Sequence, residues 1–232
     1  MEVEGCSNEA PHDVENPNTP VADSKPGSDS LSRRSPDECC IYRVPERLRD
    51  SRSKAYNPKV VSIGPFHHGN KHLEDMEEDK QRYLQYLLDR NGASLEDYEK
   101  KIKDQEEKLR GCYGNAMRLS SDQFVRIILV DTAFVIELLV RNFEDLQDDD
   151  DRIFKKRWML TNILPDMLLL ENQLPFFILK DLFDPSKVRV KNSEIGRPSI
   201  IKLSYHFFDK VVGLQKSEDQ LNQPLQKSEI SS

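Results

Sequence analysis

The stretch from residue 122 to about 143 constrains the fold most, because it predicts one long helix with an apolar face. Ser120 or Ser121, together with Gln123, supplies a helix start signal. At 100° per residue, apolar side chains gather on one side and Glu137 falls on the other. The apolar set is Phe124, Ile127, Ile128, Val135, Leu138 and Leu139. We expect this helix to be the centre of the core.

Asp131 falls in the middle of that apolar face, where an unpaired carboxylate is expensive. Asp131 and Glu171 both lie in apolar surroundings that raise a carboxyl pKa, so they are the candidates for an acid and base pair. Buried carboxylates near helix junctions more often bind backbone N–H groups. No nucleophile, glycine-rich phosphate loop or GxSxG turn stands near them in the sequence. We expect both carboxylates to be structural.

Further helices are predicted on the N-terminal side of this core helix. Apolar residues over 73–88 recur at spacings of three, four and seven, and the pattern stops before Gly92, a residue suited to the left-handed position after a helix. Ser94 begins a second pattern that carries only a thin apolar stripe as far as Leu109. We expect this second helix to lie on the surface.

The C-terminal side shows the same helical character. Pro175 fits the first turn of a new helix, and another helix is expected to begin at Ser199. Short strands are expected at most at 60–63 or 188–190. The predicted fold class is mainly α: an irregular multi-helix domain with long loops and disordered N- and C-terminal tails.

The tails differ from the helical part in composition. Residues 1–38 contain five prolines and six serines with scattered acids, and they lack the apolar surface needed to offset the entropy of ordering. We expect a disordered acidic arm over 1–38, a partial helical domain over 39–212, and a disordered polar tail over 213–232.

Charge and cysteine content narrow the classes of function. The net charge of −7 does not favour nucleic acid as a partner, because an acidic chain lacks the field that attracts phosphate. Four cysteines, two of them adjacent, match neither a disulfide framework nor a zinc spacing. A reducing compartment is therefore expected.

Three histidines, His67, His68 and His72, lie close together in the sequence and suggest a divalent metal site. Two of them share a helix face only if a helix runs through Gly69 and Asn70, which favour a turn and a helix cap instead. We expect neither a metal nor another cofactor.

The segment from Arg43 to Lys71 is the only strongly basic one, with seven Lys and Arg against Glu46 and Asp50. It suits peripheral contact with an acidic membrane surface or an acidic partner. The alternative, which we favour, is a solvated face that pairs with the chain's own acidic helices.

The order of several motifs resembles one known family. The motifs are Ile41-Tyr-Arg-Val-Pro45-Glu-Arg-Leu48, Tyr56-Asn-Pro58, Val61-Ser-Ile-Gly64-Pro65-Phe66-His67-His68-Gly69, Leu129-Val-Asp131-Thr-Ala-Phe134 and Asp166-Met-Leu-Leu-Leu-Glu171-Asn-Gln-Leu-Pro175-Phe176-Phe177. Together they resemble the plant domain-of-unknown-function 247 family. The resemblance covers about Ile41 to Phe183, and more weakly continues to Phe208.

This resemblance implies a plant-specific helical domain with no established enzymatic activity. Members usually carry a second half and a C-terminal transmembrane helix, and some grass members are implicated in pollen self-incompatibility. The chain resembles the N-terminal half and is expected to be truncated before that helix. We expect it to be cytoplasmic or peripherally membrane-associated.

The family-motif residues are expected to specify the fold. Gly64, Pro65 and Gly69 would form a rigid turn, Asp131 would anchor a polar network, and residues 171–173 would satisfy backbone groups freed by Pro175. The full predicted set is Pro45, Tyr56, Pro58, Ser62, Gly64, Pro65, His67, Asp131, Glu171, Asn172, Gln173 and Pro175.

Two functions follow from these residues. The first is a non-enzymatic regulatory or recognition protein that acts through an unknown protein partner. The alternative is a metal-assisted hydrolase that uses His67, His68 and a buried carboxylate.

Overall fold

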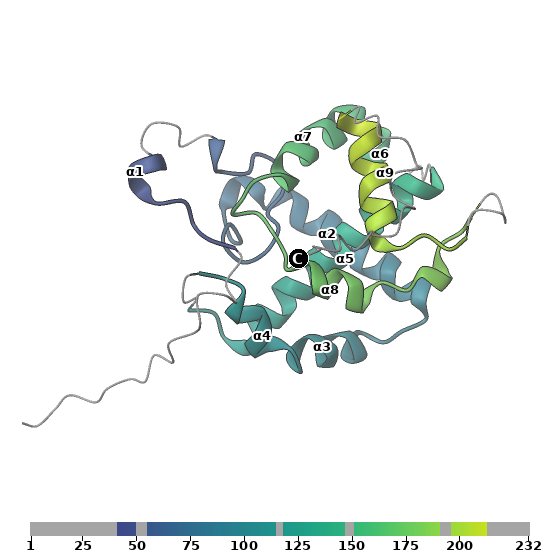
Figure 1. Cartoon of the computed structure of the whole chain (residues 1–232), viewed down its shortest axis with the longest axis horizontal. Helices are drawn as coiled ribbons and strands as arrows, with labels where there is room; N and C mark the ends of the chain where they lie inside the picture. The colour runs from purple at the N-terminus through teal and green to yellow at the C-terminus, as the bar shows by residue number, and fades with distance from the viewer. Residues whose placement is uncertain (1–40, 50–54, 115–117, 147–150, 191–195, 213–232) are drawn as a thin grey trace, which may run out of the picture. The chain divides into compact units, whose positions relative to one another are not determined.

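A computed structural model describes residues 41–49, 55–114, 118–146, 151–190 and 196–212 (Figure 1). The predicted arm over 1–38 and the predicted tail over 213–232 lie outside these residues. Within them, the elements are α1 (Glu46–Arg49), η3 (Lys71–Leu73), α2 (Asp75–Asn91), α3 (Leu95–Lys103), α4 (Glu106–Gly111), α5 (Ser121–Glu144), α6 (Arg152–Lys155), α7 (Arg157–Met167), α8 (Phe176–Leu182), η4 (Pro185–Lys187) and α9 (Ile200–Val212).

Helix α5 forms the centre of the core, as its periodicity predicts. Ser120 is the N-cap, and it forms a capping box with Gln123. Helices α2, α3, α8 and α9 all pack against α5 (Figure 1). Because neighbours cover several sides of α5, the prediction that Glu137 lies on a polar face is wrong, and this side chain is 0% exposed.

The helices before α5 depart from prediction in one respect. Helix α2 ends at Gly92, whose φ of 63° is left-handed as predicted. The stretch from Leu95 to Leu109 forms two helices, because the chain breaks between α3 and α4 at Asp104 and Gln105. The charged side of α3 is exposed, as expected of a surface helix, whereas most of its apolar stripe and Leu109 of α4 are buried.

The C-terminal helices begin close to the predicted residues. Pro175 occupies the N-cap of α8, and α9 starts directly after Ser199. In the described residues, β structure is limited to one isolated parallel bridge between Ile41 and Tyr113, so the strands considered at 60–63 and 188–190 do not form. The predicted fold class, mainly α with long loops, is confirmed.

Among the helices that the structure describes, none combines the length and apolar character needed to cross a bilayer.

Candidate functional site

Residues 59–66, which we call the extended segment, form neither a helix nor a strand, and most of them are buried. Among the described residues, no strand pairs with this segment. At the start of this segment, the carboxylate of Asp166, at the end of α7, accepts hydrogen bonds from three backbone N–H groups. The donors are Lys59, Val60 and Val61, at 2.7–3.0 Å. Asp166 is almost fully buried. Because buried N–H groups need acceptors, this single side chain fixes the path of three residues.

Asn172 continues the same role further along the segment. Its Oδ1 accepts from the Ile63 N–H at 2.7 Å, and its Nδ2 donates to the carbonyl oxygens of Val61 and Asp166, both at 3.0 Å. The amide therefore copies the donor and acceptor pattern of a neighbouring strand.

Asp131 holds the next residue from the opposite side. Its Oδ2 accepts from the Gly64 N–H at 2.8 Å, and its Oδ1 binds the Lys80 ammonium at 2.5 Å. Lys80 also donates to the carbonyl oxygen of Ser62 at 3.0 Å and contacts Glu77 at 2.7 Å. Asp131 thus joins α5, α2 and the extended segment.

Burial and charge oppose each other in this pair. Burial acts to lower the pKa of Lys80, but the carboxylates of Asp131 and Glu77 outweigh it and hold that pKa above its ordinary value. Burial raises the pKa of Asp131, and the Lys80 ammonium opposes this rise. Because Lys80 keeps its proton, it supplies the charge that Asp131 needs in an apolar core.

Gly64 is required where the segment turns. Its φ of 74° is left-handed, and a Cβ at this position would collide with the carbonyl oxygen of Gln173. Gly69 also has a positive φ, 80°. The turn expected around Gly64, Pro65 and Gly69 therefore contains two left-handed residues.

Glu171 ties the beginning of the described chain to the α7–α8 junction. Its Oε1 accepts from the Val44 N–H at 2.6 Å, and its Oε2 pairs with Arg49. The Nε2 atom of His67 lies 3.7 Å from Oε2, too far for a hydrogen bond, and is buried without a hydrogen-bond partner. Burial lowers the pKa of His67, while the carboxylate of Glu171 opposes this.

Gln173 binds the end of α7. Its Nε2 donates to the carbonyl oxygens of Met167 at 2.7 Å and Leu169 at 2.8 Å, and its own carbonyl accepts from the Tyr113 hydroxyl at 3.1 Å. The expectation that residues 171–173 satisfy groups freed by Pro175 needs correction. The backbone groups they bind belong to the α7 end, the extended segment and Val44, because the chain doubles back before α8.

We call Lys80, Asp131, Asp166, Glu171, Asn172 and Gln173 the polar frame. The other residues of the predicted set are not members of this frame. Pro45 precedes α1, and its carbonyl oxygen accepts from the Leu48 N–H at 2.9 Å. Tyr56 is half-buried, whereas Pro58, Ser62, Pro65 and Pro175 are buried.

The three histidines do not share one environment. His67 is buried, whereas His68 and His72 are exposed, and His72 Nε2 lies 3.3 Å from the carbonyl oxygen of Pro58. In the described part of the chain, no group of three His, Cys, Asp or Glu side chains is arranged to hold a metal ion.

Sequence reasoning missed Lys80 and underused Asp166. A signal for Lys80 was present, because it falls on the apolar face of α2, between Met76 and Tyr83. A lysine in that position indicates a buried acidic partner. Asp166 is the first residue of the last family motif. Its hydrogen bonds to residues more than 100 positions earlier could not be predicted from the local sequence pattern.

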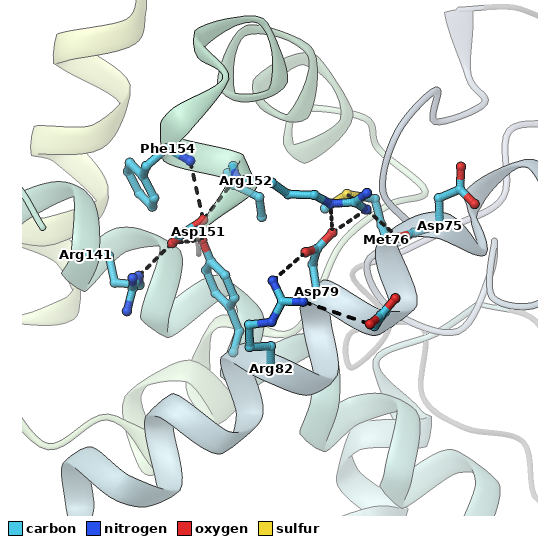
Figure 2. A network of polar contacts seen from close by, with 11 residues as sticks. Asp75, Met76, Asp79, Arg82, Arg141, Asp151, Arg152 and Phe154 are labelled. Carbon is cyan, nitrogen blue, oxygen red and sulfur yellow. Dashed lines mark hydrogen bonds and ion pairs between the residues drawn. The ribbon is translucent and has the colours of Figure 1, made fainter. Parts of the chain in front are cut away.

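A second polar network links α2, α5 and the beginning of α6 (Figure 2). Asp151 accepts from Arg141 at 2.9 Å, from the Tyr83 hydroxyl at 2.9 Å and from the Ile153 N–H at 3.0 Å. Nearby, Asp79 binds the guanidinium groups of Arg82 and Arg152. We call this group the interhelical network, because its members mostly join side chains of different helices.

Some basic side chains of the segment from Arg43 to Lys71 make contacts within the fold. Arg43 donates to the carbonyl oxygen of Phe66 at 2.6 Å, and Arg49 pairs with Glu171. Arg47, Lys59 and Lys71 are exposed. Of the five basic residues of this segment that the structure describes, Arg43 and Arg49 are therefore bound within the fold.

Comparison with known proteins identifies the class. A plant family described as a plant protein of unknown function, DUF247, matches residues 41–231. The chain belongs to this family, as its motifs predict. The match begins where the described residues begin and includes every member of the polar frame.

Two Arabidopsis thaliana relatives are similar to much of the chain. UPF0481 protein At3g47200 is 37% identical over 186 residues, which cover 78% of this chain and 37% of the relative. Putative UPF0481 protein At3g02645 is 30% identical over 142 residues, covering 60% of this chain and 26% of the relative. The chain therefore spans well under half of the length of these relatives. No solved structure matches it.

Proposed function

We propose that this protein is a plant regulatory or recognition protein that acts by binding another protein rather than by catalysis. The observation that carries the proposal is a pair of exposed leucines at the α7–α8 junction. Leu168 is 57% exposed and Leu170 is 70% exposed, while Leu169 between them is partly buried. Exposed apolar groups of this size mark interaction sites when they gather in one place.

The polar frame holds this turn in one conformation. The side-chain amides of Asn172 and Gln173 donate hydrogen bonds to the carbonyl oxygens of Asp166, Met167 and Leu169. The two leucines are therefore presented by a backbone that is already fixed. A preorganised surface loses little conformational entropy when a partner binds, which favours recognition.

The test compares partners of two serine variants in plant cells. Proximity labelling with the parent, with the double variant Leu168→Ser and Leu170→Ser, and with Ile201→Ser separates this turn from exposed apolar surface in general, because Ile201 is 54% exposed on α9. We expect specific proteins to be lost only from the double variant. An identical labelled set for all three proteins would contradict the proposal.

Contact with an acidic membrane surface is the second candidate. Exposed Arg47 and Lys71 lie in the basic segment, and two exposed apolar side chains are added by Leu48 in α1 and Tyr42 before it. Basic residues with nearby apolar groups suit the interface of an anionic bilayer. A cytoplasmic or peripherally membrane-bound protein fits either candidate.

Vesicle sedimentation tests this second candidate. Binding to phosphatidylserine vesicles but not to phosphatidylcholine vesicles, weakened in the double variant Arg47→Glu and Lys71→Glu, supports it. Equal binding by the parent and the variant excludes it. Nothing in the arrangement of His67 and His68 favours the hydrolase alternative.

A further inference from the structure

A pocket of about 190 Å³ lies between α2 and α5, and Asp131 of the polar frame is one of its lining residues. Helix α2 contributes Glu77 and Gln81, and the loops contribute His68 and Leu119. The lining residues on α5 are Gln123, Arg126, Ile127, Val130 and Asp131. The α5 residues recur at helical spacing, so they form one continuous face.

One end of this pocket is acidic. Glu77 and Asp131 both contact the ammonium of Lys80, at 2.7 Å and 2.5 Å, which places the two carboxylates together. Two carboxylates and one ammonium leave a net charge of about −1 at this end. The Oε1 atom of Glu77 contacts Lys80, and the Glu77 side chain is 32% exposed, so it can also reach a ligand.

The other end is basic, and the middle is apolar. Arg126 donates to Gln81 at 2.5 Å, which connects α5 to α2, and it lies 3.9 Å from Glu99. Arg126 and Asp131 are five residues apart on α5, a rise of about 7.5 Å. Ile127 and Val130 lie between them on the same face and are buried.

We propose that this pocket binds a short ω-amino carboxylate: an ammonium group and a carboxylate separated by a chain of methylene groups. The ammonium faces Glu77, beside the buried pair of Asp131 and Lys80, the methylenes lie on Ile127 and Val130, and the carboxylate faces Arg126. A purely cationic ligand is repelled by Arg126 and a purely anionic ligand by Glu77. An α-amino acid carries both charges on one carbon and cannot reach both ends.

The volume agrees with a ligand of this size. An apolar cavity of about 150 Å³ holds benzene, which has about six non-hydrogen atoms. The pocket is somewhat larger, and 5-aminopentanoate has about eight such atoms. Ligands this small bind with dissociation constants on the order of 1 mM. This binding goes beyond the proposed function, because Leu168 and Leu170 at the α7–α8 junction take no part in it.

The experiment is an NMR titration of the full chain, following amide signals of Ile127 and Val130. The probe is 5-aminopentanoate. Its isomer 2-aminopentanoate has the same atoms with both charges on one carbon, pentylamine lacks the carboxylate, and pentanoate lacks the ammonium. We expect saturable shifts with 5-aminopentanoate and at least roughly tenfold weaker binding of the other three, the loss expected for one well-placed charged contact.

Variants test the assigned residues with matched controls. Glu77→Gln and Arg126→Gln change partly exposed side chains, and each should weaken 5-aminopentanoate binding roughly tenfold. Glu78→Gln and Arg82→Gln alter neighbouring charges on α2 outside the pocket and should leave binding unchanged. Absence of saturation, equal binding of 2-aminopentanoate, or binding that survives both pocket variants would overturn the proposal.

Discussion

The polar frame and the interhelical network are both built from charged residues, but they stabilise different things. In the frame, Asp166 and Asn172 bind backbone groups of a segment that has no secondary structure of its own. In the network, Asp79 and Asp151 mainly bind side chains of helices (Figure 2). The frame therefore decides where a loop goes, whereas the network adjusts helices that other forces already place.

Exposure separates the two regions as well. The carboxylates of the frame and their partner Lys80 are at most 2% exposed. The network carboxylates Asp79 and Asp151 are as deeply buried, but the arginine partners of Asp79, Arg82 and Arg152, have side chains that are 36% and 40% exposed. Water can replace a lost arginine partner of Asp79 but not the buried Lys80 of the frame. Disruption of the frame should therefore cost more.

The largest effect is expected from Asp131→Ala. This change leaves the fully buried Lys80 ammonium without its main partner and the Gly64 N–H without an acceptor. We expect the free energy of unfolding, measured in urea, to fall by about 3–5 kcal/mol. The double variant Asp131→Leu with Lys80→Met should recover part of this loss. An Asp131→Ala protein as stable as the parent would show that the pair is not structural.

The next effect is expected from Asp166→Ala, which removes the acceptor of three backbone N–H groups. We expect a loss of about 2–4 kcal/mol, because buried donors are left unpaired. Hydrogen exchange should accelerate at Lys59, Val60 and Val61 more than at Ile153, whose N–H is bound within the interhelical network. Uniform acceleration at all four residues would contradict a local role.

A pH effect should distinguish the two regions, because the frame surrounds a buried histidine. Burial lowers the pKa of His67 in the folded protein, opposed by Glu171 and Asp166 and assisted by Arg43 and Arg49. The unfolded chain therefore binds the proton more tightly. The stability that depends on neutral His67 is complete above about pH 6.5 and is lost as the pH falls toward the lowered folded-state pKa.

The measurement is the difference between the parent and His67→Gln in urea unfolding at pH 7.0 and pH 5.5. We expect the parent to lose up to about 1 kcal/mol more than the variant over this interval. The carboxyl groups titrate in both proteins, so their contribution to the pH dependence cancels in the difference. Parallel pH profiles would mean that His67 is protonated as easily in the fold as outside it.

The smallest effect is expected from Asp79→Asn in the interhelical network. Its arginine partners are partly exposed, so we expect a loss of about 1 kcal/mol or less. Glu78→Gln is the matched control, since the side chain of Glu78 is 89% exposed. A loss as large as that of Asp166→Ala would remove the distinction between the two regions.

Local patterns were enough to predict most helices. The capping box at Ser120 and the left-handed Gly92 mark helix ends through contacts within a few residues, and the structure has both. Periodicity failed where neighbours decided the outcome. Glu137 is buried because Arg90 from α2 reaches it at 2.7 Å, and no pattern within α5 contains that information.

The same holds for the candidate site: its residues could be predicted from local sequence, but their distant partners could not. The motif residues Glu171, Asn172 and Gln173 could be selected from the sequence, and so could Asp131. Their partners could not, because each bond from Asn172 to the extended segment spans about 110 residues of chain. Lys80 was detectable as a charge on an apolar face, but the identity of its partner was not.

The long sequence separation within the polar frame also has a consequence for the order of events during synthesis. The extended segment is complete at residue 66, yet its acceptors Asp166 and Asn172 follow 105–109 positions after the groups they bind. At about 5–20 residues per second, a ribosome needs roughly 5–20 s to add them. Throughout that interval the N–H groups of Lys59, Val60, Val61 and Ile63 lack their native acceptors. Closure of the nascent domain must therefore wait for the α7–α8 junction to emerge, however early α2 and α5 form.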